Sequence, residues 1–562
     1  NTTVHIAGAI GKETYLMLPL GRGRLWYWSK EEEQSVWYKS IQIIEQDEIG
    51  SWDSVIKRIK NKLDKIQLSP PKLSLESEFK ILVSLFNKGN YNETIEKGEF
   101  LTSYFKSSHN LCNIIGAAYI KIKNYDKAKY FHKKSIELNS KFYIGFYNLG
   151  YTCWELGELE QSEKYCLKSL KLNPNYAYPY NTLGAVFKDK SEYKKAEKYF
   201  KKAIELDKNY VQPKYNLSIL KAYLAEEQND IKNAKKYYKK ASLLNNSYYT
   251  PIYNLALVQL YDCQFKEGFI NHDYRWSISS FAKKKLHTNQ PLWSPSLTTD
   301  NHVTIWPEQG IGDFILYSRF LPDLLNQVNK FTVVVHEKTK SLHRRSFPQI
   351  DFVTEINTGN IDHHAPIGDL AKFYVNSTND VKQRSDNYLV VDKSRTQEIK
   401  ELLPKGKKIC GISWISKNED IGKNKSMTLE DMKDLLLLPD ITFVDLQYTD
   451  TADERAEFKK KYGVEILKLE EIDNFDDIDG LASLIDACDF VVSVSNTTVH
   501  IAGAIGKETY LMLPKDRGQI WYWSKEDEQS IWYKSVKIFE RNKINKWENV
   551  IKKIKQKIKG QI

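Results

Sequence analysis

The sequence predicts a multidomain protein that joins an all-helical solenoid to a two-lobed α/β region, with a partial copy of the last lobe before the solenoid. Three observations predict this class: an internal repeat of 34 residues, strand–turn–helix units in the carboxyl-terminal half, and a stretch duplicated at the two ends. At 562 residues the chain is too long for a single hydrophobic core, so several domains are expected.

The start of the chain duplicates a stretch near its end. Residues 1–19 (NTTVHIAGAIGKETYLMLP) recur letter for letter at 496–514, an offset of 495 that continues without a gap beyond this stretch. We interpret residues 1–68 as the tail of a lobe and 69–75 as a linker. Two origins stay open: a fragment of a larger tandem array, which the start within a turn favours, or an artefact of gene duplication or assembly. We expect no chemistry from His5, because the other half of its lobe is missing.

Residues 76–276 carry the 34-residue period. Small residues recur at two phases of it, at Gly116, Gly150 and Gly184 and at Ala128, Ser162 and Ala196. Additional residues around 225–230 are expected to lengthen one helix or its turn. Small residues at helix crossings with this period are similar to the tetratricopeptide repeat, whose solenoids present a concave face to a peptide or protein.

A glycine loop between a strand and a helix marks the first α/β lobe. Val303–Trp306 is an apolar strand, and the string PEQGIGD leads from it to Asp313 and a helix expected to run to Leu325. Gly310 and Gly312 would let a ligand approach the backbone closely. Asp313 either acts as a general base or caps the helix, and one carboxylate can do both.

The second lobe centres on Ser495–Pro514, SNTTVHIAGAIGKETYLMLP. A buried strand at 489–494 leads into a hydroxyl-rich turn and then His500. The small residues at 501–505 suit a closely packed helix, which Gly506 can end in a left-handed conformation before the next strand. Backbone N–H groups at that helix start, with Thr497, Thr498 and His500, would form an anion site at the carboxyl end of the first strand. The other interpretation is a structural turn with a satisfied histidine.

Both lobes resemble one family of enzymes. The string EQGIGDFxxxSRFLP and the turn before HIAGA are similar to the two halves of GT-B glycosyltransferases of the heptosyltransferase-like type, glycosyltransferase family nine, which have two Rossmann-like lobes. Gly268–Trp276 (GFINHDYRW) is similar to the last repeat of bacterial proteins that join tetratricopeptide repeats to a transferase, and the combination also resembles O-linked N-acetylglucosamine (GlcNAc) transferases. The predicted domains are a partial lobe copy at 1–68, a linker at 69–75, the solenoid at 76–276, the amino-terminal GT-B lobe on the acceptor side at 277–400 and the carboxyl-terminal, nucleotide-sugar lobe at 401–562.

The resemblance implies a metal-independent glycosyltransferase of the hexosyl or heptosyl type. Its donor substrate would be a nucleotide diphosphate sugar, with no other cofactor, and its acceptor a hydroxyl group, which a protein recruited by the repeats could carry. Asp313 would be the general base, and Lys425 and Ser426 would contact the nucleotide phosphates. The residues expected to bind the nucleotide sugar are Gly310, Gly312, Lys425, Ser426, Ser495, Asn496, Thr497, Thr498 and His500.

One departure from the family keeps a second interpretation open. Ser495 stands where these enzymes often carry an aspartate. The alternative is therefore a protein-interaction scaffold with a degenerate transferase domain.

The composition of the chain limits the binding partners and the cellular compartment that we expect. The net charge of +11 is spread over 83 basic and 72 acidic residues without an arginine-rich arm, so no nucleic-acid partner is predicted. The six cysteines lack paired metal spacing and are expected to be reduced. No signal peptide and no apolar run that could cross a bilayer is found in the sequence, so a cytoplasmic protein without a transmembrane segment is expected.

Overall fold

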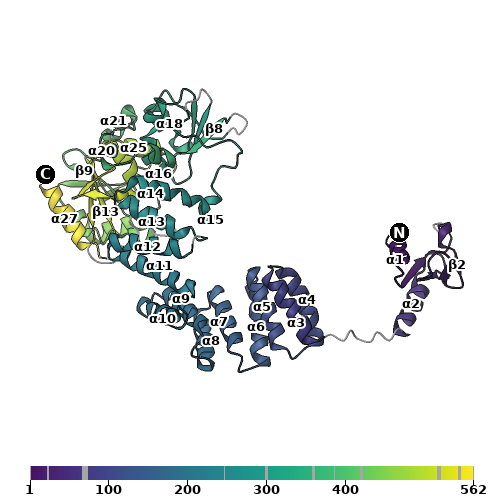
Figure 1. Cartoon of the computed structure of the whole chain (residues 1–562). Coiled ribbons are helices and arrows are strands. Elements are labelled where there is room, and N and C mark those ends of the chain that lie inside the picture. The colour runs from purple at the N-terminus through teal and green to yellow at the C-terminus, as the bar shows by residue number, and fades with distance from the viewer. Residues whose placement is uncertain are drawn as a thin grey trace. The chain divides into compact units, whose positions relative to one another are not determined.

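The computed structural model of the chain separates into two compact units, Asn1–Thr152 and Cys153–Ile562, whose helices and strands are labelled in Figure 1. The described residues are 2–21, 25–65, 74–245, 247–297, 302–356, 361–384, 387–417, 422–515, 520–541 and 546–560. Most of the predicted linker at 69–75 lies outside them.

The amino-terminal copy folds into a small α/β element, which we call the half-lobe (residues 2–65). Its elements are α1 (Thr2–Ala9), β1 (Thr14–Leu18), β2 (Lys30–Glu31), β3 (Gln34–Ser35), β4 (Ile41–Glu45) and α2 (Asp53–Lys65). The sheet order is β1-β4-β3-β2, so β1 is an edge strand. Trp37 is 59% exposed here, whereas its counterpart Trp532 in the complete lobe is fully buried. The same helices and strands form in both copies, but the tryptophan is buried only in the complete lobe.

Paired antiparallel helices follow the half-lobe. They are α3 (Leu75–Asn87), α4 (Tyr91–Tyr104), α5 (His109–Lys121), α6 (Tyr125–Leu138), α7 (Tyr143–Glu155), α8 (Leu159–Leu172), α9 (Ala177–Asp189), α10 (Tyr193–Leu206), α11 (Val211–Glu227), α12 (Ile231–Leu244), α13 (Thr250–Tyr261) and α14 (Phe265–His272). Helix α11 has 17 residues where its neighbours have 13 or 14, as the insertion around 225–230 predicted.

The recurring glycines lie where two helices cross. A Cβ added to Gly184 on α9 would lie 2.5 Å from Cδ1 of Phe200 on α10, and one added to Gly116 would lie 2.4 Å from Cδ2 of His132. Both facing rings are fully buried. The repeat period therefore records sites of helix contact that leave no room for a side chain.

Gly184→Ala is expected to lower the free energy of unfolding by about 1–2 kcal/mol, although alanine is the better helix former. The buried ring of Phe200 has no space to retreat, so the overpacking cost exceeds the gain in helix propensity of about 1 kcal/mol. Urea denaturation measures the change. Phe200→Leu in the same chain should restore part of the loss, and equal stability of the wild type and Gly184→Ala would contradict the close contact.

The last helical pair packs on the α/β region as well as on the preceding repeat. The ring of Phe265 meets Trp532 edge-on at 5.9 Å between centroids, and Phe269 meets Trp521 at 5.7 Å. These rings are buried. Helices α13 and α14 therefore share a core with the carboxyl-terminal lobe.

The first α/β lobe contains a four-stranded parallel sheet of order β7-β6-β5-β8. Its strands are β5 (Val303–Trp306), β6 (Phe331–Val334), β7 (Asp351–Val353) and β8 (His363–Pro366). The single helix expected up to Leu325 is two helices, α16 (Ile311–Ser318) and α17 (Leu321–Leu325). The break falls before Pro322, whose ring cannot continue the preceding helix but suits a first turn.

The second lobe contains a sheet of order β11-β10-β9-β12-β13-β16-β15-β14. The parallel strands are β9 (Lys408–Ser413), β10 (Ile441–Asp445), β11 (Ile466–Leu467), β12 (Phe490–Val494), β13 (Thr509–Leu513) and β16 (Val536–Glu540), and β14 (Lys525–Glu526) and β15 (Gln529–Ser530) add an antiparallel hairpin. The chain order reverses between β9 and β12. Helix α26 (Thr497–Ala504) joins β12 to β13, and α27 (Glu548–Lys559) closes the lobe.

Helix α26 begins earlier than the sequence suggested, at Thr497 rather than after His500. The side chain of Asn496 accepts a hydrogen bond from the backbone N–H of Thr498 and so starts the helix at this point. Gly506 follows the helix with a φ of 74°, the left-handed conformation predicted for it.

The described helices include none that is long and apolar enough to cross a membrane. All six cysteines are free thiols, and only Cys263 is more than slightly exposed.

Candidate functional site

Residues from both α/β lobes meet where helices α16 and α26 begin. A Cβ added to Gly312 on α16 would lie 2.8 Å from Cδ2 of His500 on α26. The positive charge of Lys425 is close enough to lower the pKa values of both Asp313 and His500. Residues taken from three distant segments of the chain therefore gather in one place.

Asp313 is the carboxylate at this meeting point. It is half-buried, and burial raises its pKa to about 6. A hydrogen bond from the Tyr522 hydroxyl, the backbone N–H groups of Gly310 and Asp313, and the charge of Lys425 oppose this rise. Gly310 is the N-cap of α16, so the carboxylate also caps its own helix. At neutral pH the carboxylate is therefore mostly ionised and can accept a proton.

Lys425 ends the short helix α22 (Gly422–Lys425) after β9. Only 3% of its surface is exposed, and it forms no hydrogen bond or ion pair with the described residues. Burial lowers its pKa to about 8, while the negative charge of Asp313 acts in the opposite direction. A buried ammonium group without a partner is costly, so this position favours a negatively charged ligand.

His500 is buried and neutral at physiological pH, because desolvation and the charge of Lys425 lower its pKa to about 3. Its Nδ1 lies 3.0 Å from the hydroxyl of Tyr533. The Tyr388 hydroxyl lies 2.9 Å from the Ile315 carbonyl and 3.4 Å from the Tyr533 hydroxyl. In the tautomer in which Tyr533 donates to Nδ1, the ring proton of His500 is on Nε2 and that nitrogen is a donor.

The first turn of α26 adds further donors. Thr498 is fully buried, and its Oγ1 has no hydrogen-bond partner in the part of the chain that the structure describes. Thr497 is half-buried at the first helical position. Thr497 and the first-turn N–H groups other than that of Thr498, which Asn496 caps, form a surface that favours an anion.

Three residues that were predicted to bind the nucleotide sugar form hydrogen bonds within the lobe. Ser495 Oγ accepts a hydrogen bond from Nε1 of Trp523 at 2.8 Å. Ser426 Oγ accepts from the Ser416 N–H at 2.9 Å and donates to the Gly422 carbonyl at 2.8 Å. Asn496 caps α26 and donates from Nδ2 to Oγ of Ser413 at 2.7 Å. These hydrogen bonds hold the three side chains in place within the lobe.

A cavity of about 290 Å³ lies beside the ends of β10 and β11. Two of its lining residues, Thr449 and Asn474, carry buried oxygens without a hydrogen-bond partner among the described residues. Gln447, also in its lining, accepts at Oε1 from Ser413 Oγ at 3.0 Å, and Ser413 bonds Asn496. A chain of hydrogen bonds thus connects this cavity to the start of α26.

A buried charge cluster links the last repeat to the loop that carries Asp313. Arg275, in the 3-10 helix Asp273–Ser277, donates from Nη2 to Glu308 Oε2 at 2.9 Å and to Asp369 Oδ1 at 2.6 Å. Burial raises the pKa of Glu308 to about 7, against the charge of Arg275. This cluster ties the segment after α14 to the first α/β lobe.

The hydrogen bond between Tyr522 and Asp313 and the Arg275 cluster are contacts that the sequence did not predict. The aromatic run from Trp521 to Trp523 was visible, but nothing in it shows which ring reaches a carboxylate more than 200 residues away. In the part of the chain that the structure describes, no group of three or more His, Cys, Asp and Glu side chains is arranged to hold a metal ion.

Comparisons with known proteins identify the repeats. Residues 142–209 match one tetratricopeptide repeat model, and residues 109–142 and 215–248 match a second. Helices α5 to α12 are therefore tetratricopeptide repeats, and they indicate a protein-interaction scaffold.

One curated relative and several solved structures are similar to parts of the chain. Protein FlbA of Caulobacter vibrioides is 26% identical over 306 residues, which are 50% of this chain and 50% of FlbA, so the chain spans about half the length of this relative. MamA of Desulfovibrio magneticus RS-1 is 17% identical with a TM-score of 0.27, over 31% of this chain and 95% of that one. TTC0263 of Thermus thermophilus is 19% identical with a TM-score of 0.29, over 33% and 100%. The Cut9–Hcn1 structure is 16% identical with a TM-score of 0.34, over 40% and 44%.

Proposed function

We propose that the α/β region is a GT-B glycosyltransferase that moves a sugar from a nucleotide diphosphate sugar to a hydroxyl group on a protein held by the repeats. The observation that carries the proposal is Lys425, a buried lysine with no partner among the described residues, next to the start of α26 and to Asp313. A diphosphate is the ligand whose charge this arrangement suits best.

The strand order of the second lobe supports a nucleotide ligand. Taken in chain order, its parallel strands β9 to β13 and β16 lie in the order 3-2-1-4-5-6, which doubly wound nucleotide-binding sheets share. In such sheets ligands bind at the carboxyl ends of the strands, where the order reverses. Lys425 follows β9 and α26 follows β12, the two strands on either side of that reversal.

Each part of the donor has a matching surface. Lys425, the Nε2–H of His500, the Thr498 hydroxyl and the first turn of α26 would hold the two phosphates. The nucleoside would occupy the 290 Å³ cavity beside β10 and β11, where buried oxygens offer hydrogen-bond acceptors. A cavity of this size is at the small end for a ligand site and fits one part of a donor rather than the whole.

Asp313 lies on the opposite lobe and would take the proton of the acceptor hydroxyl. As the hydroxyl oxygen bonds to the anomeric carbon, the bond from that carbon to the diphosphate breaks and its electron pair leaves on the phosphate oxygen. Lys425, His500 and the α26 start neutralise that charge, usually the largest contribution to such catalysis. This scheme requires no divalent metal.

A second function is favoured by separate observations. The repeat matches indicate a scaffold, and Ser495, at the family's aspartate position, bonds Trp523. In this alternative the repeats recruit a partner and the transferase domain is degenerate.

Calorimetric titration of the full chain with UDP, ADP and GDP separates the two functions. We expect one nucleoside diphosphate to bind in the micromolar range, and the matching nucleoside without phosphates to bind at least tenfold more weakly, because the phosphates supply the charge–charge contacts. EDTA in the cell should leave the affinity unchanged. The absence of heat with all three diphosphates would favour the scaffold.

A further inference from the structure

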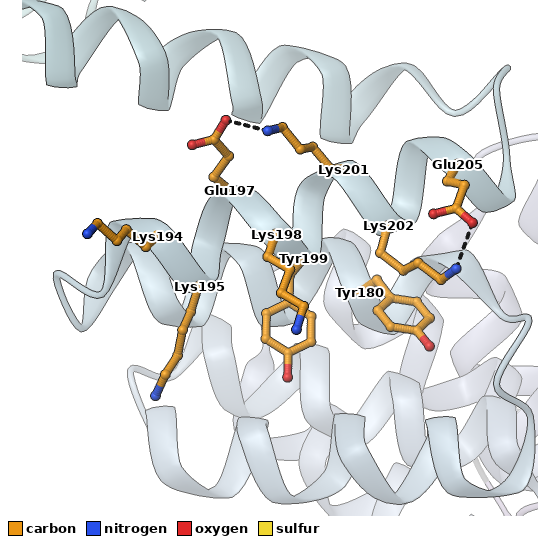
Figure 2. Close-up of a pocket in the computed structure, with 9 residues that line it drawn as sticks. All are labelled: Tyr180, Lys194, Lys195, Glu197, Lys198, Tyr199, Lys201, Lys202 and Glu205. Carbon is orange, nitrogen blue, oxygen red and sulfur yellow. Dashed lines mark hydrogen bonds and ion pairs between the residues drawn. The ribbon is translucent and has the colours of Figure 1, made fainter.

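A groove runs along the repeat formed by α9 and α10, away from the α/β site, and encloses about 850 Å³ (Figure 2). Helix α10 supplies all of its lining except Tyr180, which belongs to α9. In Figure 2 the lysines of α10 extend on several sides of this helix, and the two lining tyrosines lie near one another. The groove therefore lies along α10, the second helix of its repeat.

The lining carries an excess of positive charge. Five lysines face two glutamates, a formal surplus of three charges. Glu197 pairs with Lys201 at 2.8 Å, and Glu205 pairs with Lys202 at 2.8 Å. The exposed Lys194 and Lys198 form no ion pair or hydrogen bond with the described residues. Lys195 pairs with Glu192, outside the lining, at 2.5 Å. The charges of Lys194 and Lys198 therefore remain for a ligand.

Aromatic rings give the groove an apolar floor. Tyr199 stacks on Phe187 with 5.2 Å between ring centroids, and the Tyr180 ring lies 6.3 Å from that of Tyr199. Desolvation raises the pKa of Tyr199, so its hydroxyl stays protonated and can donate a hydrogen bond. Apolar ring faces beside ammonium groups suit an extended peptide with carboxylate side chains.

We propose that this groove binds an acidic, extended segment of a partner protein. The inference rests on the proposed function only in assuming that the repeats bind a protein, and it does not depend on sugar transfer. Charge complementarity names the partner: carboxylates pair with Lys194 and Lys198, and the backbone of the segment lies over Tyr180 and Tyr199. A nucleic acid is the poorer match, because the basic surface covers one helix and contains two carboxylates.

Fluorescence anisotropy with a fluorescein-labelled peptide of eight glutamates tests the proposal on the full chain. Lys194→Glu together with Lys198→Glu should weaken binding about tenfold or more, since two charge pairs are lost and repulsion replaces them. Raising the salt concentration should weaken wild-type binding. Both lysines are exposed, so circular dichroism and the melting temperature should remain unchanged.

The matched control is Lys232→Glu together with Lys236→Glu on α12, two exposed lysines with the same spacing 38 residues further on. This variant should bind the peptide as the wild type does. Three results would each overturn the proposal. They are equal losses of peptide affinity in the two double variants, no peptide binding by the wild type, and tighter binding of an eight-nucleotide single-stranded DNA that is lost in the α10 variant. The titrations with UDP, ADP and GDP are repeated on the α10 variant. If none of the three binds either the wild type or the variant, the transferase proposal fails, whereas failure of the wild type to bind the peptide contradicts only the groove.

Discussion

Asp313→Asn is expected to lower the rate of sugar transfer by about 10²–10⁴-fold while nucleoside diphosphate affinity stays within about twofold. The amide cannot accept the proton of the acceptor, yet its oxygen can still accept the N–H of Gly310 and cap α16. The rate is measured as nucleoside diphosphate released from UDP-, ADP- and GDP-sugars. An unimpaired rate would remove Asp313 as the base.

The pH dependence gives an independent control on the same group. A general base must be ionised, and burial raises the pKa of Asp313 to about 6. The value of kcat/KM should therefore fall as the pH drops through about 6 and level off above it. An acidic limb near pH 4, the range of an ordinary aspartate, would mean that another group is titrating.

Lys425→Met should weaken diphosphate binding about 10–100-fold, because one charge-assisted hydrogen bond is worth about 1.5–3 kcal/mol. Methionine has a similar length and needs no water, so the stability of the folded chain should stay equal or rise. Calorimetry measures the affinity and thermal melting the stability.

Lys423→Met is the matched control for this variant. Lys423 lies on the same short helix α22 but is exposed, and its loss should leave the affinity unchanged. If both variants lost affinity equally, long-range charge rather than contact would explain the binding. Unchanged affinity in Lys425→Met would show that the buried ammonium does not face the phosphates.

Local pattern was sufficient to predict much of the fold. The strand before Ser495 and the left-handed Gly506 could be read from short runs of β-branched and small residues, because both depend on near neighbours. The crossing glycines, such as Gly184, could be found from their period alone. The start of α26 was placed too late, since the cap supplied by Asn496 competes with the turn that the hydroxyl residues suggested.

Less of the candidate site than of the fold could be predicted from the sequence. Asp313, Lys425 and His500 were named from motifs, and the structure brings them together. Ser426 and Ser495 fit the same motifs, but their hydroxyls serve neighbouring loops. The partner Ser416 is 10 residues from Ser426, and Trp523 is 28 residues from Ser495. No residue pattern shows which hydroxyl remains available.

The duplicated sequence gives this protein two sets of tryptophans in contrasting environments. Trp37 and Trp52 of the half-lobe are 59% and 38% exposed, whereas Trp532 and Trp547 of the complete lobe are 0% and 4% exposed. A soluble quencher such as acrylamide would extinguish the emission of the first pair well before that of the second. Trp37 and Trp52 are thus optical reporters of the uncovered copy, and Trp532 and Trp547 report on the integrity of the lobe that contains His500.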